Sequence, residues 1–292
     1  MKTLVFGARG WIGTQFLNNT SHQTIIASTR PENAQECYDE IKSIRPDCVI
    51  SFIGRTHGKA PDGRVVPSID YLELPGKLYE NMRDNFYGPF NLAKICEELN
   101  IHFVYLGTGC IYTYTSEKRV FTEDDIPNFY GSQYSTVKGY TDQVLRHFKN
   151  TLQLRIRMPL SKIVSTRSFI DKIVGYPNIC SMPNSMTMLD DMWPIIDKMI
   201  EARECGVYNF VNPGVADHDW ILKQYKTLIN PAHTWNLVSY EDQMKYIKSD
   251  RSNNEMSTSK LEQFCQKYDL ELIPLQESIL RCLQRRMMEA VD

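Results

Sequence analysis

Short apolar runs alternate with amphipathic segments through the first half of the chain. The apolar runs have the length of buried β-strands and lie at 2–7, 23–28, 47–53, 102–107 and 152–157. Longer segments with a helical spacing of apolar residues separate them, most clearly at 76–100 and 131–150. Strands and helices in strict alternation are typical of a parallel sheet that helices cover on both faces.

The second half of the chain is less regular. The run YNFVN, at 208–212, predicts a late strand of the same sheet, while 188–202 and 273–290 have the periodicity of helices. Proline and irregular polarity at 157–164 and 183–188 are typical of loops over a ligand.

These patterns predict an α/β protein with a Rossmann-type, doubly wound parallel sheet and a smaller C-terminal substrate-binding lobe. We expect the nucleotide-binding domain at 1–158, with a late strand near 206–212 returning to it. The substrate-binding lobe is expected mainly at 159–292, without a linker of distinct composition between the two parts.

The composition narrows the class of partner. With 292 residues and 42% hydrophobic content, the chain can bury a full core without disulfides or a structural metal ion. A formal net charge of -2 and a pI near 6.3 give no general attraction to nucleic acid or anionic lipid. The apolar segment in MKTLVFGARG is too short for a signal peptide, and no apolar run reaches about 18 residues, so we expect a cytoplasmic protein that does not enter a membrane. Its 8 cysteines are scattered, which indicates reduced thiols and no metal site.

A glycine-rich turn follows the first predicted strand. Gly7, Gly10 and Gly13 are spaced as GxxGxxG at the opening of a helix, with Trp11 and Ile12 between them. Glycines there permit a tight turn, and the helix N-terminus offers unpaired N–H groups to a pyrophosphate. The position therefore predicts a dinucleotide-binding site.

Two further segments bear on the cofactor. Arg30 follows the second strand, where an NAD enzyme usually has an acidic residue for the ribose hydroxyls. A guanidinium can pair with a 2′-phosphate, so NADPH is favoured over NADH. Ile53 and Gly54, directly after the third strand, are also expected to line the cofactor.

A tyrosine and a lysine have the spacing of an acid–base pair on one helix. Tyr134 and Lys138 lie four residues apart in QYSTVKG, hence on one face. A nearby ammonium stabilises phenolate, so we expect Lys138 to lower the pKa of Tyr134, which would then exchange a proton with a carbonyl oxygen. Thr108 ends the fourth strand, at the edge of the sheet where ligands bind, and its hydroxyl can share that oxygen.

Together with the glycine turn, these three residues resemble the reductase triad of the extended short-chain dehydrogenases/reductases. Over nearly the full length, the chain also resembles the bifunctional nucleotide-rhamnose synthases, the UDP-4-keto-6-deoxyglucose 3,5-epimerase/4-reductases. The resemblance rests on segments that occur in the same order: GWIG, TGCIY, EDDIPNFYGSQYSTVKG, LRIRMP, SFIDKI, PNSMT, YNFVNPG and RSNNE.

The resemblance implies a second reaction at the same site. In TGCIY, Cys110 stands two residues after Thr108, where the related GDP-L-fucose synthases have a cysteine that carries protons for epimerisation. Lys172, in SFIDKI, is implied as its partner and as the cation that favours the Cys110 thiolate. A buried structural thiol is the alternative for Cys110, and an ordinary exposed lysine is the alternative for Lys172.

The resemblance also implies substrate-binding residues and partners. The residues implied to hold the nucleotide sugar are Asn85, Asn184, Ser185, Arg251, Asn253 and Asn254. A separate 4,6-dehydratase would supply the keto sugar. The oligomeric state stays open, with a homodimer among the alternatives. UDP and dTDP substrates stay open, as does the question whether His57, in the divergent segment 55–66, meets ligand or solvent.

Two other functions of this superfamily compete with the epimerase/reductase. One is a reductase without epimerase activity, as in dTDP-4-dehydrorhamnose reductase. The other is a non-catalytic NADP-binding subunit, such as the regulatory subunit of methionine adenosyltransferase. Cys110 and RSNNE favour the bifunctional enzyme over both.

Overall fold

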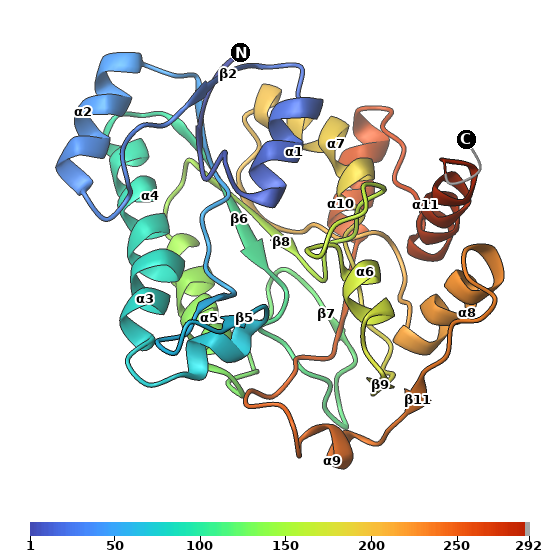
Figure 1. Cartoon of the computed structure of the whole chain (residues 1–292). Helices are drawn as coiled ribbons and strands as arrows, with labels where there is room; N and C mark the ends of the chain where they lie inside the picture. The colour runs from blue at the N-terminus through green and yellow to red at the C-terminus, as the bar shows by residue number, and fades with distance from the viewer. Residues whose placement is uncertain (290–292) are drawn as a thin grey trace.

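A single six-stranded parallel sheet forms the centre of the computed structural model, which describes residues 1–289 (Figure 1). Its strands are β1 (Lys2–Phe6), β2 (Gln23–Ile26), β3 (Cys48–Ser51), β6 (His102–Thr108), β8 (Thr151–Ile156) and β10 (Gly206–Asn209). Their order across the sheet is β10-β8-β6-β3-β1-β2, and every pairing is parallel. The chain leaves β1 in one direction and returns to β3 in the other, so ligands are expected at the carboxyl ends of these two strands.

Helices cover both faces of the sheet, which confirms the predicted doubly wound architecture (Figure 1). One face carries α1 (Trp11–Asn19), α7 (Leu189–Glu201) and α10 (Ser259–Lys267), and the other carries α2 (Ala34–Ile44), α4 (Gly88–Glu98) and α5 (Gln133–Leu145). Phe16 of α1 meets Trp193 of α7 with ring centroids 6.3 Å apart. Because α7, β10 and α10 come from the second half of the chain, that half completes the first domain as well as forming the smaller lobe.

The predicted helix at 76–100 is not a single α-helix. A short 3₁₀-helix, η1 (Ile69–Glu73), precedes α3 (Leu78–Met82), and a π-turn, η2 (Arg83–Tyr87), joins α3 to α4. Such π-turns often mark functional sites because they redirect the side chains they carry. The difference from the prediction is local, since helical periodicity cannot detect one extra residue in a turn.

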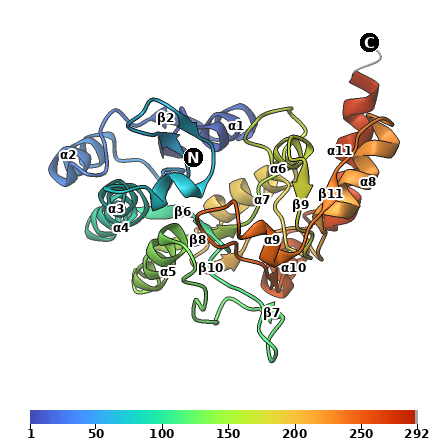
Figure 2. The same cartoon turned by 60° about the horizontal axis from the view of Figure 1, so that its bottom comes forward.

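The smaller lobe lies beside the central sheet and its helices (Figure 2), and it has its own apolar core. It consists of α6 (Phe169–Val174), α8 (His218–Leu228), α9 (Tyr240–Gln243), α11 (Leu275–Glu289) and the parallel pair β9 (Asn178–Ile179) and β11 (Asn236–Leu237). Leu160, Met186 and Ile279 are fully buried in this core.

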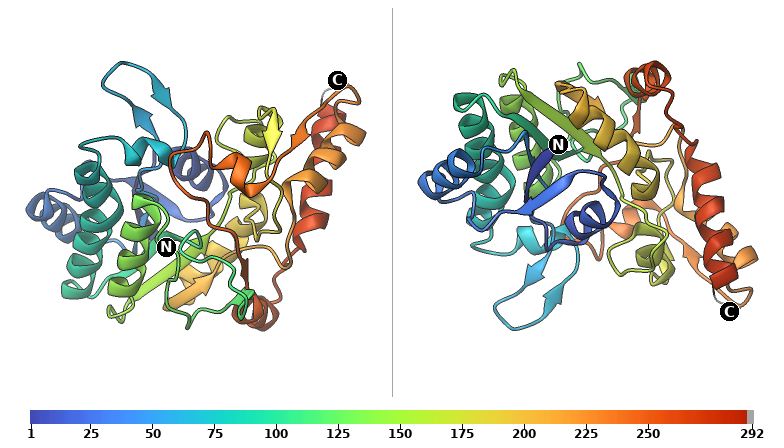
Figure 3. Two further views of the ribbon diagram at one scale, coloured as in Figure 1. Left: turned by 90° about the horizontal axis from the view of Figure 1, so that it is seen from below. Right: turned by 90° about the horizontal axis from the view of Figure 1, so that it is seen from above.

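Two further strand pairs lie outside the central sheet. Strand β7 (Val120–Phe121) pairs in parallel with β12 (Glu255–Met256), and so joins the segment after β6 to the end of RSNNE. An antiparallel hairpin of β4 (Gly58–Lys59) and β5 (Val65–Val66) protrudes from the molecule (Figure 3). Over residues 1–289, no helix combines the length and apolarity needed to cross a membrane, and no group of three metal-ligating side chains occurs.

Candidate active site

The turn between β1 and α1 fits the pyrophosphate of a dinucleotide. Gly7 has a φ of +76°, and a Cβ on Gly13 would lie 2.3 Å from the carbonyl oxygen of Gly7. Gly10 caps α1 without any side-chain hydrogen bond, so the first N–H groups of the helix remain open to an anion. Trp11 and Ile12, the first helical residues, are half-buried against the core of this face.

The segment after β3 lies against this turn and is held from behind by Asn85. A Cβ on Gly7 would approach the side chain of Ile53 to 3.2 Å, and Gly54 is exposed. Asn85 accepts from the backbone N–H of Arg55 and donates to its carbonyl, both at 2.9 Å. Since both ends of the buried amide are bonded inside the protein, Asn85 positions this loop rather than meeting substrate, contrary to the expectation from sequence.

Arg30 is free to reach a phosphate. Its side chain is 77% exposed, and its closest acidic contact is Glu32 at 4.0 Å. The acidic side chain near the end of β2 is that of Glu40, which comes from α2. It accepts hydrogen bonds from the backbone and hydroxyl groups of Ser28 and Thr29. The carboxylate is thus engaged in holding the loop, while the guanidinium points into solvent.

Thr108 and Tyr134 meet at the carboxyl edge of the sheet. Thr108 is the last residue of β6, and Tyr134 lies in the first turn of α5, which Ser132 caps. Burial raises the pKa of Tyr134, negative charge at Cys110 raises it further, and a hydrogen bond with Thr108 opposes the shift. The phenol therefore keeps its proton at neutral pH, as a proton donor to a carbonyl must.

Lys138 lies one helical turn beyond Tyr134, as predicted, but its ammonium group has another partner. It donates a hydrogen bond to the hydroxyl of Tyr105 on β6 and lies 4.6 Å from the centre of that ring. Burial lowers the pKa of Lys138 to about 7, whereas the charges of Asp142 and Cys110 oppose the shift. The expected lowering of the Tyr134 pKa by Lys138 is wrong, because burial is the largest cause at both groups and raises the pKa of Tyr134.

Cys110 lies beside the phenol rather than in a separate hydrocarbon pocket. Its backbone N–H donates to the hydroxyl oxygen of Thr108 at 3.1 Å. Its half-buried side chain packs against a small cluster of Tyr71, Leu72 and Tyr134. A hydroxyl, a phenol and a thiol thus face one space at the end of β6.

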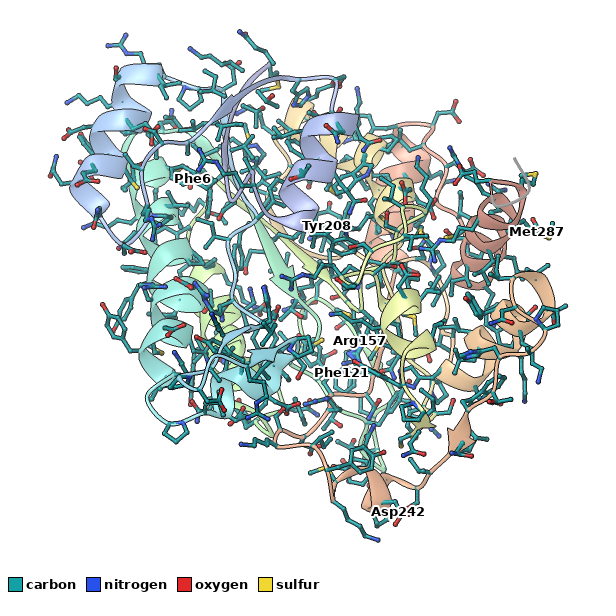
Figure 4. The ribbon with its side chains drawn as sticks, viewed as in Figure 1. Phe6, Phe121, Arg157, Tyr208, Asp242 and Met287 are labelled. Carbon is teal, nitrogen blue, oxygen red and sulfur yellow. The ribbon has the colours of Figure 1, made fainter. Side chains whose placement is uncertain are left out.

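The cation that contacts Cys110 is Arg157, which the sequence analysis missed. Its Nη1 lies 3.9 Å from the sulfur, and the residue is 1% exposed (Figure 4). We expected Lys172 to contact the Cys110 sulfur. The cation in contact with it is instead Arg157, the residue directly after the active-site strand β8. Arg155 and Arg157 alternate in a run that is otherwise buried and apolar, and buried guanidinium groups need partners. This alternation was the signal in the sequence from which a buried role for Arg157 could have been predicted.

The implied substrate residues brace the loop that carries Cys110. Asn254 donates to the carbonyl oxygens of Gly109 and Tyr112 at 2.9 and 3.0 Å. The Asn184 amide oxygen accepts from Arg157 and from the backbone N–H of Asn254, and its amide nitrogen donates to Asn253 at 2.9 Å.

A hydroxyl and an ion pair complete this brace. Ser185 accepts from the backbone N–H of Met256 at 2.9 Å. Arg251 pairs with Asp70 at 2.8 Å and joins the smaller lobe to η1. Asn184 and Ser185 are buried with their polar groups bonded within the protein, which speaks against direct contact with substrate. Asn254 is also buried, and its amide nitrogen is bonded, but its amide oxygen has no partner among residues 1–289.

Lys172 belongs to a second cationic group. Arg167 lies against the imidazole of His57, with Nη1 2.7 Å from Nδ1. Burial, then the charges of Arg167, Arg55 and Lys172, lower the pKa of His57 to about 4. Burial and the charge of Arg167 also lower the pKa of Lys172. Within residues 1–289 no carboxylate is paired with Arg167 or Lys172, so this group fits an anionic ligand.

Comparisons with known proteins agree with this geometry. No family model matches the chain. It is 46% identical over 270 residues to the uncharacterized protein L780 of Acanthamoeba polyphaga mimivirus, covering 90% of this chain and 92% of L780. The crystal structure of the L780 UDP-rhamnose synthase matches with a TM-score of 0.90 and 43% identity, over 98% of this chain and 99% of that chain.

Two other proteins extend the comparison. A bifunctional dTDP-4-dehydrorhamnose 3,5-epimerase/dTDP-4-dehydrorhamnose reductase of Arabidopsis thaliana is 36% identical over 287 residues, covering 95% of this chain and 91% of its own. A dTDP-4-dehydrorhamnose reductase of Bacillus anthracis, solved in complex with NADP, has the same fold, with a TM-score of 0.80 at 16% identity over 99% of both chains.

The parallel sheet, the glycine turn and the meeting of Thr108 with Tyr134 define an extended short-chain dehydrogenase/reductase. The long alignments above 30% identity narrow the class further. The chain belongs to the nucleotide-rhamnose synthase family, whose members combine an epimerase with a reductase.

Proposed function

We propose that the protein converts UDP-4-keto-6-deoxy-D-glucose to UDP-L-rhamnose, by 3,5-epimerisation followed by NADPH-dependent reduction of the 4-keto group. The observation that carries the proposal is the Cys110 thiol packed beside the Tyr134 phenol, behind a glycine turn that fits a dinucleotide. Reduction alone needs the phenol but has no use for the thiol. Both groups at one ketone support both reactions.

Epimerisation uses the acidity that the ketone gives to its neighbouring carbons. Removal of a proton from C3 or C5 leaves an electron pair that is delocalised onto the C4 oxygen as an enolate. Cys110 and Lys172 form the acid–base pair in this proposal: one group takes the proton, and the other returns a proton to the opposite face. Burial and the charge of Arg167 lower the pKa of Lys172 below the ordinary lysine value, which makes its ammonium form a stronger acid than that of an exposed lysine.

Reduction uses the groups at the end of β6 and the start of α5. Tyr134 donates its proton to the C4 oxygen, and Thr108 shares that oxygen through its hydroxyl. NADPH, when bound, supplies the hydride. Gly7, Gly10 and Gly13 make room for its pyrophosphate, and Lys138 is within one helical turn of the phenol to hold the ribose.

Residues next to the glycine turn are further proposed contacts of the cofactor. Trp11 and Ile12 open the helix that faces the pyrophosphate, and Ile53 with Gly54 borders the turn from β3. Arg30 is the proposed partner of the 2′-phosphate that distinguishes NADPH from NADH.

Arg167 and Lys172, which pair with no carboxylate among residues 1–289, favour a diphosphate-linked sugar. Arg251 and Asn253 are the proposed contacts from RSNNE, since both are only half-buried. A separate enzyme, a 4,6-dehydratase, would supply the keto sugar. We further propose a cytoplasmic location and a homodimer.

An exchange experiment tests the proposal. UDP-4-keto-6-deoxyglucose is incubated with the enzyme in deuterated water without NADPH, and C3 and C5 are examined by NMR. We expect solvent deuterium at both carbons, whereas a reductase without epimerase activity or a non-catalytic subunit would incorporate none. Cys110→Ala should abolish exchange while still reducing a pre-epimerised 4-keto sugar, and Tyr134→Phe should do the opposite. Exchange that persists in Cys110→Ala would refute the role of the thiol.

A further inference from the structure

A buried arginine without a carboxylate partner lies beneath Cys110. Arg157 follows β8, and its Nη2 donates to the amide oxygen of Asn184 and, at 2.5 Å, to the carbonyl oxygen of Ser252. Its Nη1 donates to the Ser252 hydroxyl at 3.1 Å and lies 3.9 Å from the Cys110 sulfur. Its Nε has no hydrogen-bond partner.

The charge of this guanidinium needs compensation. Moving a cation into the interior costs several kcal/mol unless an anion or a full set of hydrogen bonds offsets the loss of water. Within residues 1–289, the groups whose negative charge would favour the charged form of Arg157 are the thiol of Cys110 and the phenol of Tyr114, and no carboxylate is among them. The hydrogen bonds to Asn184 and Ser252 come from neutral groups.

Of these two groups, Cys110 is the suitable anion. Thiols ionise more readily than phenols, and Cys110 contacts the guanidinium directly, whereas the Tyr114 hydroxyl donates to the carbonyl oxygen of Pro183 at 3.0 Å. A cation next to a cysteine favours the thiolate, which is the nucleophilic and basic form.

We infer that Arg157 is a positioning residue that holds Cys110 as a thiolate, so that Cys110 enters epimerisation as the base. This rests on the proposed function and goes beyond it by assigning the starting proton state. The thiolate takes a proton from the carbon next to the ketone and becomes a thiol, while the electron pair moves to the C4 oxygen. The proton for the opposite face then comes from Lys172 in its ammonium form.

The inference also explains why two sequence motifs are buried. Asn184 in PNSMT and Ser252 in RSNNE fix both ends of the guanidinium, and Asn254 holds the carbonyl groups on either side of Cys110. Asn184, Ser252 and Asn254 thus support the cation and the thiol together, while Arg251 and Asn253 of RSNNE stay the proposed substrate contacts.

Alkylation of individual cysteines tests the inference without any substrate. The wild-type enzyme is treated with iodoacetamide across a pH series, and modification of each cysteine is followed by peptide mass spectrometry. Cys205, which is half-exposed and distant in sequence, serves as the internal reference, since burial raises the pKa of its thiol. We expect Cys110 to react at lower pH than Cys205. Reaction at the same or a higher pH would overturn the inference, and this result needs no variant.

Two variants show whether Arg157 is the cause. Arg157→Met should slow alkylation of Cys110 near neutral pH by about tenfold or more and move its pH profile upward, while Cys205 is unaffected. Arg157→Lys should restore part of the rate, because it keeps the charge but not the planar fork. An unchanged Cys110 profile in a folded Arg157→Met variant would refute the assignment.

If Arg157→Met does not fold, Ser252→Ala, which removes one acceptor, is expected to shift the profile in the same direction, and no shift would count against Arg157. Deuterium exchange separates this inference from the proposed function. A reactive, Arg157-dependent thiol without exchange would contradict the function alone. Exchange with a thiol that is independent of Arg157 would contradict the inference alone.

Discussion

The titration of Lys138 gives a prediction whose size follows from the structure. The side chain is 4% exposed, and burial lowers its pKa from 10.5 to about 7. In the unfolded chain the lysine stays protonated up to its ordinary pKa, so between these values the unfolded state binds more protons than the folded state. Stability that depends on this group must therefore rise with pH across that window and fall as the pH drops toward the folded pKa.

The magnitude follows by integrating the proton difference. At about 1.4 kcal/mol per pH unit, with the folded group half-protonated at the start, the gain between about pH 7 and about pH 9 is roughly 2 kcal/mol. Lys138→Met, which has a similar length and no charge, should lack this rise. Urea unfolding of the nucleotide-free proteins at three pH values in this range would measure the difference between wild type and variant.

The control is Lys94→Met, at an exposed position of the neighbouring helix α4, which should track the wild type at every pH. If the wild-type and Lys138→Met stabilities change in parallel with pH, the lysine is not held at a lowered pKa in the folded protein. In that case the reasoning from burial fails.

Three further changes follow from the same contacts. In Gly13→Ala the new Cβ lies 2.3 Å from a backbone oxygen, so the change should destabilise the fold by about 1–3 kcal/mol. It should also abolish NADPH binding, measured by nucleotide fluorescence, and normal binding would refute the assignment of the glycine turn to the pyrophosphate. Tyr105→Phe removes the acceptor of the Lys138 hydrogen bond and should reduce kcat for ketone reduction by about tenfold while leaving deuterium exchange unchanged, and loss of both would point to a folding defect instead. Asn254→Ala leaves the Gly109 carbonyl without its side-chain donor and the Tyr112 carbonyl with the Ser252 hydroxyl alone, so it should cost about 1–3 kcal/mol in urea unfolding, and a smaller loss would mean that water replaces the amide.

The sheet could be predicted from the sequence because each strand is an apolar run bounded by turn residues. All six predicted strands occur, and the run at 152–157 is displaced by only one residue from β8 at Thr151–Ile156. The pairs β4–β5 and β7–β12 could not be predicted, since strands of two residues have no periodicity to detect. The π-turn at Arg83–Tyr87 escaped for a related reason.

The reductase residues could be placed because their relation is local. Tyr134 and Lys138 share a helix face through a spacing of four, and Thr108 ends the strand as expected. Arg157 was missed because its meaning depends on Cys110, 47 residues earlier in the chain. Such a contact arises from tertiary folding and leaves only an indirect trace, an arginine in a buried strand.

The polar residues of the second half show where motif reasoning fails. The family resemblance implies that Asn184 and Asn254 hold substrate, and amide groups can bond a nucleotide. The fold instead uses them to satisfy carbonyl and guanidinium groups that burial would otherwise leave without partners. The same donor chemistry serves a ligand or the protein itself, and only burial distinguishes the two.

The two proposed reactions also depend on each other electrostatically. Burial is the main cause of the raised pKa of Tyr134, and negative charge at Cys110 raises it further. A thiolate beside Arg157 would therefore serve as the base for epimerisation and, through the same charge, keep the phenol protonated for the later reduction. When Cys110 has taken a proton, that support for the phenol is lost until the thiolate forms again. The charge state of Cys110 thus couples the two reactions, since the phenol has this support before epimerisation begins and again once the thiol has lost its proton.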